Sequence, residues 1–273
     1  MENNEQNNNI AKRGAGLIII VVALLMAVLG LGGYIMYDKF FNDNKSSKTT
    51  EKEEKKEEKK EEKVENLEVT SKEVTDLFNS ITHGVTEYCG VDNYFVDKKV
   101  TINDIENGLA SSIVLYNLYQ SGVKYGEGTT ITKKQVEDTI TKLFGKNYKY
   151  TYGNIRNCPS YTYDAEKEVF TAGPSGCGGT CGPHNMKKVV KATKSDSKIE
   201  LYVRMLFIGE YTNDQQIKYY SDYKKTKEAN LEKDKDGIPY ETDANYQKGS
   251  LYKMTFTKED SNYVFTSSEP VNE

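Results

Sequence analysis

Tryptophan is absent from this sequence, histidine occurs only twice, and neither sign of charge dominates, with 37 basic against 41 acidic residues. The balanced charge argues against a nucleic-acid partner, because binding to phosphate backbones needs a strongly positive surface. Two histidines leave few ways to build a hydrolase or a metal site that depends on imidazole groups. The composition therefore favours a binding or interaction protein over an enzyme.

Only one long apolar run is present, residues 14–37, and it contains no charged side chain. A helix of that length rises about 36 Å, enough to cross a hydrocarbon core of about 30 Å. The run is too long for the apolar region of a cleaved signal peptide, which spans about 7–15 residues. The sequence predicts an uncleaved, single-pass transmembrane helix that contacts the lipid bilayer.

The basic pair Lys12 and Arg13 lies directly before this helix, on a short tail. Long domains that follow an anchor are translocated largely regardless of their charge. We therefore expect residues 1–13 to be a cytoplasmic tail and the C-terminal domain to lie outside the cell membrane.

The segment 38–66 contains the run "EKEEKKEEKKEEK". Its period of four places like charges at positions i and i+4, which weakens an isolated helix. The composition is that of a coiled coil, but no apolar seam at heptad spacing accompanies it. The sequence predicts a disordered, solvated spacer between the membrane and the folded domain.

The remaining residues, 67–273, are enough for one domain with a proper core. Three segments carry helix start and stop signals, each with a capping threonine, a polar partner three residues later and a terminal glycine. These signals are Thr70, Glu73 and Gly84; Thr101, Asp104 and Gly122; and Thr132, Gln135 and Gly145.

After residue 147 the apolar pattern changes from a helical period to alternation, which predicts strands. We expect a strand over 148–152, hairpins turning at 164–167, 195–197 and 259–262, and a central strand over 199–208 that is apolar on both faces. Helices followed by antiparallel strands predict an α+β domain with three helices packed on a mainly antiparallel sheet.

The stretch "GPSGCGGTCGPHN", residues 173–185, holds two of the four cysteines. A phosphate-binding loop would need a Lys-Ser/Thr pair and a helix after the glycines, whereas a strand pattern follows here. A zinc site would usually bring a second close pair of cysteines. A nucleophilic Cys181 would need His184 as its base, and their closeness in sequence does not establish that geometry.

Four cysteines outside the membrane most simply predict disulfide bonds, because an oxidising compartment stabilises them. Four cysteines allow three connectivities, and a hairpin centred near Ala165 would favour the one that pairs Cys158 with Cys177. This pairing leaves Cys89 for Cys181. The stretch is then a disulfide-stapled loop.

The stretch "LEKDKDGIPYETD", residues 231–243, matches a calcium loop in part. Oxygen ligands would come from Glu232, Asp234, Asp236 and Asp243 at positions 1, 3, 5 and 12. The piece resembles the Asp-rich repeats ending "DGIP" of extracellular calcium-binding proteins, but it occurs once and lacks the closing glutamate. The alternative is a polar turn without metal, and no other cofactor is expected.

Tyrosine is abundant, with 21 residues, and Tyr148, Tyr150 and Tyr152 alternate along one expected strand. Such a row can form the core-facing side of a sheet or a binding platform for a cell-wall glycan or an envelope protein. Taken together, the sequence predicts a membrane-anchored, extracytoplasmic binding module of a bacterial cell envelope. The alternative is an envelope hydrolase that uses Cys181 with His184, or paired carboxylates.

Overall fold

The computed structural model describes residues 63–85, 91–124, 126–174, 184–211 and 217–272. The expected tail 1–13, the transmembrane segment 14–37 and nearly all of the spacer 38–66 lie outside these residues. Among the described helices, none has the length and apolar character needed to span a membrane.

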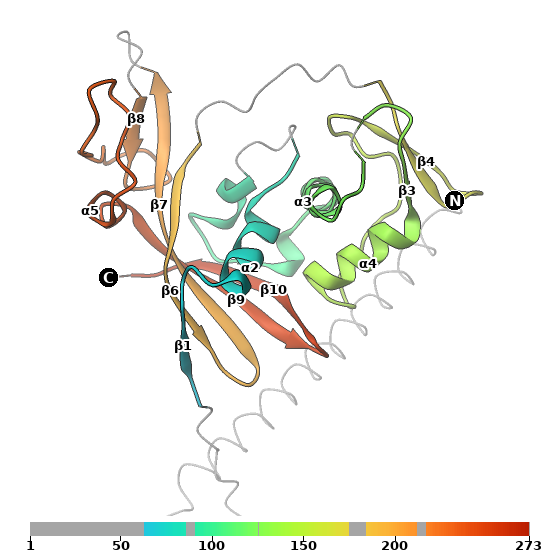
Figure 1. Cartoon of the computed structure of the whole chain (residues 1–273), viewed down its shortest axis with the longest axis horizontal. Coiled ribbons are helices and arrows are strands. Elements are labelled where there is room, and N and C mark those ends of the chain that lie inside the picture. Colours follow the sequence, from blue (N-terminus) through green and yellow to red (C-terminus); the bar gives the residue numbers. More distant parts are fainter. Residues whose placement is uncertain (1–62, 86–90, 125, 175–183, 212–216, 273) are drawn as a thin grey trace, which may run out of the picture. The chain divides into compact units, whose positions relative to one another are not determined.

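An antiparallel sheet forms the centre of the described domain (Figure 1). Its strands follow the order β1-β6-β7-β9-β10-β2, and β8 pairs with the end of β7. The strands are β1 (Glu65–Leu67), β2 (Val100–Thr101), β6 (Met186–Lys194), β7 (Lys198–Tyr211), β8 (Ile217–Tyr220), β9 (Ser250–Glu259) and β10 (Asn262–Pro270).

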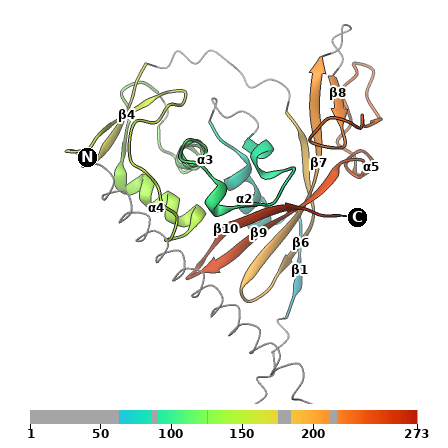
Figure 2. The ribbon, with the colours of Figure 1, turned by 180° about the vertical axis from the view of Figure 1, so that it is seen from behind.

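Three helices, α2 (Lys72–Thr82), α3 (Asn107–Gln120) and α4 (Lys133–Phe144), lie on one side of this sheet (Figures 1 and 2). Helix α3 supplies the centre of the core, because Ile113 and Leu115 are fully buried among side chains of the sheet and of the other helices. Two short helical turns lie near these helices, η2 (Val91–Phe95) and η3 (Ile102–Asp104). The short helix α5 (Asp243–Tyr246) lies across the sheet from them, where Tyr246 packs with Leu206 of β7 and Tyr219 of β8 (Figure 1).

A second, smaller sheet has the order β3-β5-β4. Its strands are β3 (Thr130–Thr132), which runs directly into α4, β4 (Tyr161–Asp164) and β5 (Val169–Ala172). The side chains of Ile131 and Phe170 are fully buried and belong to the same core as the three helices. The small sheet is therefore an extension of the main domain.

The strand face opposite the helices carries a row of paired charges. Lys198 contacts Glu200 at 2.9 Å, Lys253 contacts Glu269 at 2.9 Å, and Lys253 also lies 3.7 Å from Glu200. Lys99 extends the row with a 3.2 Å contact to Glu269. Because the neighbouring residues Ile199, Leu201 and Val203 point into the core, the alternation along the first half of β7 separates an apolar face from a charged one. In the second half the buried Leu206 makes the other face apolar as well.

The α+β class and the mainly antiparallel sheet are confirmed. The hairpins between β4 and β5, β6 and β7, and β9 and β10 turn where the sequence predicted. The long strand β7 lies in the middle of the sheet, as its two apolar faces indicated. The expected strand over 148–152 is wrong: the described chain there belongs to neither sheet.

Two of the three helix starts also differ from the prediction. Ser71, not Thr70, caps α2, because the Thr70 hydroxyl donates a hydrogen bond to Glu68 at 2.7 Å instead. The expected single helix from Thr101 is divided: the Thr101–Asp104 capping box starts only the short turn η3, and α3 begins at Asn107.

The predicted start and end of α4 are confirmed, with a capping box between Thr132 and Gln135 and a positive φ of 81° at Gly145. Gly122 also has a positive φ, 95°, just after α3. Gly84 does not; its role is close packing, because an added Cβ would lie 2.4 Å from the Ser112 hydroxyl.

Candidate functional site

Cys158 is the one cysteine among the described residues, and it is disulfide-bonded. The hairpin register pairs Tyr161 with Ala172, and the Gly173 amide donates to the Ser160 carbonyl at 2.8 Å, so the ladder continues toward Cys158. Its predicted partner Cys177, like Cys89 and Cys181, lies outside the described residues. The connectivity therefore stays a prediction.

His184 is exposed and lies two residues before β6, at the start of a described segment. Its carbonyl accepts a hydrogen bond from Tyr219 at 3.5 Å. Because Cys181 lies outside the described residues, the Cys181–His184 hypothesis stays a prediction as well.

The calcium-like segment forms a tight turn. The Asp234 carboxylate accepts hydrogen bonds from the backbone amides of Asp236 at 2.9 Å and Ile238 at 2.8 Å. Asp243 lies in the first turn of α5 and forms an ion pair with Lys188 at 2.6 Å. Within the described residues, no three His, Cys, Asp or Glu side chains gather as a metal site would require. Two of the predicted calcium ligands therefore have other partners: Asp234 bonds to backbone amides, and Asp243 pairs with Lys188. Calcium binding stays a prediction.

The buried Asn245 amide holds this turn in place. Its oxygen accepts from the Glu232 amide at 2.9 Å, and its nitrogen donates to the carbonyls of Glu232 at 2.9 Å and Tyr240 at 2.8 Å. No sequence signal singled out Asn245, because a lone asparagine in a polar stretch has no distinctive pattern.

The three tyrosines predicted as a binding surface are half-buried and pack against the main core. The Tyr148 hydroxyl donates to the Ile105 carbonyl at 2.8 Å, and the Tyr150 hydroxyl lies 2.7 Å from the Ser111 hydroxyl. Burial raises the pKa of Tyr148 to about 12. Tyr152 contacts Tyr150 at a ring distance of 5.2 Å. These contacts attach the row to the core, and its use as a binding surface stays a prediction.

Replacing Tyr148 by phenylalanine removes its hydrogen bond to Ile105 and should lower the free energy of unfolding by about 1 kcal/mol. Urea unfolding followed by circular dichroism measures this change. Tyr223→Phe is the matched control, because Tyr223 is exposed and its hydroxyl has no hydrogen-bond partner in the described part of the chain. Equal midpoints for both variants would contradict the structural role of Tyr148.

A buried ion pair joins η2 to β6. The Asp92 carboxylate lies 3.6 Å from the Lys187 ammonium and accepts a hydrogen bond from the Asn185 amide at 3.2 Å. The ammonium also donates to the Thr82 carbonyl at 3.2 Å, at the end of α2. This group ties three elements together.

His83 lies beside this ion pair and stacks on Tyr116 with a ring distance of 5.1 Å. Burial lowers the pKa of His83, and the nearby Lys187 charge lowers it further, while the Asn79 carbonyl and Asp92 oppose the shift. His83 is therefore held neutral and packs as an aromatic ring.

A groove of about 500 Å³ opens between α2, α3, the last turn of α4 and the β9–β10 hairpin. We call it the helix groove. Its base is apolar, with Leu77, Leu143 and the buried Phe256. Two tyrosine rings, Tyr116 and Tyr263, form part of its walls. The volume lies within the range of small-molecule sites.

The other lining of the helix groove is mostly neutral and polar. It contains side-chain amides from α2, α3 and β10 and the hydroxyl groups of Ser80, Ser121 and Ser261. The amides belong to Asn79, Asn117, Gln120 and Asn262. The sequence patterns did not reveal this site, because its residues are scattered over distant segments.

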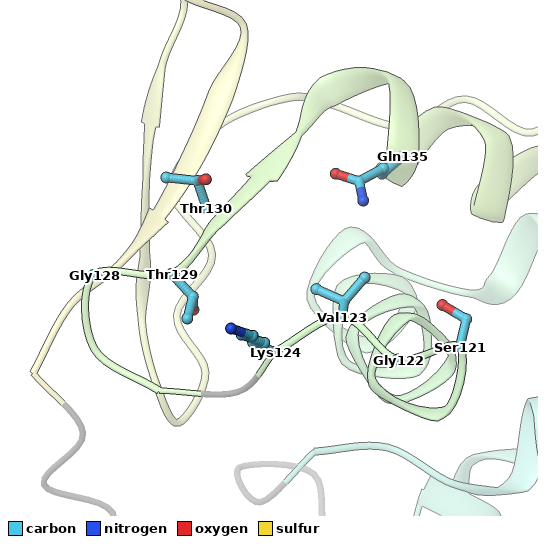
Figure 3. A pocket seen from close by; sticks show the side chains of 8 residues that line it. All are labelled: Ser121, Gly122, Val123, Lys124, Gly128, Thr129, Thr130 and Gln135. Carbon is cyan, nitrogen blue, oxygen red and sulfur yellow. The ribbon is translucent and has the colours of Figure 1, made fainter.

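A second cavity of about 590 Å³ adjoins the first at Ser121, which lines both (Figure 3). Its side chains include Lys124, Thr129, Thr130 and Gln135. Val123 is its one aliphatic lining side chain among the described residues. Because little apolar surface is offered, this cavity alone would bind a ligand weakly.

Comparison with family models, with curated proteins and with solved structures finds no match to this chain.

Proposed function

We propose that this protein is a membrane-anchored, extracytoplasmic binding module of a bacterial cell envelope. The helix groove is the observation that carries the binding function. It combines apolar side chains with neutral polar groups from α2, α3 and the β9–β10 hairpin. Such concave, mixed surfaces are typical of ligand sites.

The location is supported by two independent features. Disulfide bonds persist in oxidising compartments, and Cys158 is disulfide-bonded. The apolar run 14–37 is long enough to anchor the chain in a bilayer. The charged spacer would then hold the domain away from the membrane surface.

An accessibility assay with introduced cysteines tests this location. Asp196→Cys places a thiol in the exposed turn between β6 and β7. A membrane-impermeant maleimide should label it in intact bacterial cells. Asn4→Cys, in the expected cytoplasmic tail, is the control and should be labelled only after permeabilisation.

The opposite pattern, with position 196 protected and position 4 labelled, would show that the domain faces the cytoplasm. Alkylation without reduction, followed by intact-mass measurement, checks the disulfide bonds of the unmodified chain. Alkylation of Cys158 would remove the support that the disulfide gives to an external location.

A further inference from the structure

We propose that the helix groove binds a neutral oligosaccharide containing N-acetylated sugar rings. This inference rests on the proposed binding function and names its ligand class. It depends on the hydrogen-bonding capacity of the groove, on its charge and on its length.

The hydrogen-bonding groups of the groove include unused donors and acceptors. Within the part of the chain that the structure describes, the side chains of Asn79, Gln120 and Asn262 have no hydrogen-bond partner. Each amide can donate and accept. Sugar hydroxyl and acetamido groups also do both, so they can pair with these amides in several orientations.

Asn117 has a more fixed orientation. Its nitrogen donates to the carbonyls of Ser80 and Ile113, both at 2.8 Å, which leaves its oxygen as an acceptor. The hydroxyls of Ser80 and Ser121 donate to helix carbonyls, so their oxygens remain acceptors too. The oxygens of Asn117, Ser80 and Ser121 can therefore accept a hydrogen bond from a sugar hydroxyl. A fully ionised phosphate, which only accepts hydrogen bonds, could not bond to them.

The charges in the groove largely cancel against neighbours. Glu73 forms an ion pair with Lys194 at 2.7 Å, and Asp76 forms one with Lys72. Among the described residues, Lys142 is the one cation that lines the groove. A single exposed lysine does not build an anion site, so the neutral amides dominate recognition.

An apolar ligand would fit the groove poorly. It would cover the amides without pairing them, and each unpaired polar group costs free energy when water is removed. A sugar ring avoids this cost, because its edge carries hydroxyl groups and its face carries C–H groups. Leu77 and the rings of Tyr116 and Tyr263 offer apolar surface to that face.

The length of the site favours a chain of sugar rings. Ser121 lines both the helix groove and the second cavity. The hydroxyl and amide groups of the second cavity come from Thr129, Thr130 and Gln135 (Figure 3). These hydroxyl and amide groups are of the same kinds as those of the helix groove, and Lys124 adds one cation. An oligomer can occupy both parts, whereas a single sugar would fill only one.

Isothermal titration calorimetry of the full-length chain in detergent micelles tests the proposal. The probe is the β-1,4-linked tetrasaccharide of N-acetylglucosamine at millimolar concentration. We expect saturable heat of binding. Gln120→Ala and Asn262→Ala should each weaken binding about two- to tenfold, since each removes one neutral hydrogen bond.

Asn230→Ala is the matched control, because Asn230 is an exposed asparagine that does not line the groove; its affinity should equal that of the unaltered chain. Urea unfolding of each variant verifies that it is folded. Absence of binding heat, or unchanged affinity of both groove variants, would overturn the proposal.

Two competitors separate the other ligand classes. If inorganic phosphate displaces the tetrasaccharide, the site recognises an anion through Lys142 and the proposal is wrong. If acetylated tetra-alanine amide binds as tightly, the site recognises peptides. A domain found outside the cell that binds no saccharide would refute the ligand class alone, whereas a domain found in the cytoplasm would refute the proposed function.

Discussion

Replacing Asp92 by alanine should destabilise the domain by about 3–5 kcal/mol, the cost of leaving a buried charge without its partner. Asp92 is 2% exposed, and its carboxylate neutralises Lys187, whose side chain is 18% exposed. Burial lowers the pKa of Lys187, and Asp92 opposes that effect. Urea unfolding of the full-length chain, followed by circular dichroism, measures the loss.

A double variant makes this prediction specific. Lys187→Met in the Asp92→Ala background removes the stranded charge and should recover part of the lost stability. Asp138→Ala is the control, since its ion pair with Lys134 is exposed and worth at most about 1 kcal/mol. A double variant less stable than Asp92→Ala alone would contradict the buried-pair account.

Phe170→Ala should cost about 3–5 kcal/mol, because it removes a fully buried ring from the core. Phe170 lies in β5, opposite Ile131 on β3 and Tyr163 on β4, and its ring centroid is 4.5 Å from that of Tyr163. The same side chain belongs to the core that the helices share. Loss of the ring should therefore weaken the whole domain rather than the small sheet alone.

Urea unfolding with circular dichroism and tyrosine fluorescence distinguishes these outcomes. We expect both signals to change in a single, earlier transition. Thr171→Ala is the matched control, because Thr171 is the exposed neighbour on the same strand and should change stability by at most about 0.5 kcal/mol. Two separate transitions for Phe170→Ala would show that the small sheet unfolds independently.

The sequence predicted the elements whose signals are local. The α4 capping box between Thr132 and Gln135, the hairpin turns and the central strand β7 all depend on residues close together in the chain. The prediction failed where a competing contact intervened. Thr70 could cap a helix, but its hydroxyl bonds to Glu68, and Ser71 takes the role.

The tyrosine row shows a different limit. The alternation of Tyr148, Tyr150 and Tyr152 predicted a strand, yet the segment is irregular. Its rings pack against the core, and Tyr152 also lies 6.1 Å from Tyr163 of β4 between ring centroids. Period alone does not say which element covers a face. Partners such as Ile105 and Ser111 lie about 40 residues away in sequence, so only the folded chain identifies them.

The helix groove could not be predicted for the same reason. Its amides come from α2, α3 and the start of β10, and each is an ordinary surface residue when read alone. The buried pair of Asp92 and Lys187 joins residues more than 90 positions apart. The residues next to each partner in the chain give no signal for such pairings.

The edge strand β1 determines where mechanical load would enter the domain. It consists of only three residues, pairs with β6 alone, and follows directly on the charged spacer. Tension on the N-terminal segment therefore reaches the fold first at Glu65. The Glu65–Lys194 pair would be the first to separate, because only three residue pairs join β1 to the sheet. β1 would thus yield first under tension and leave the groove and its helices intact.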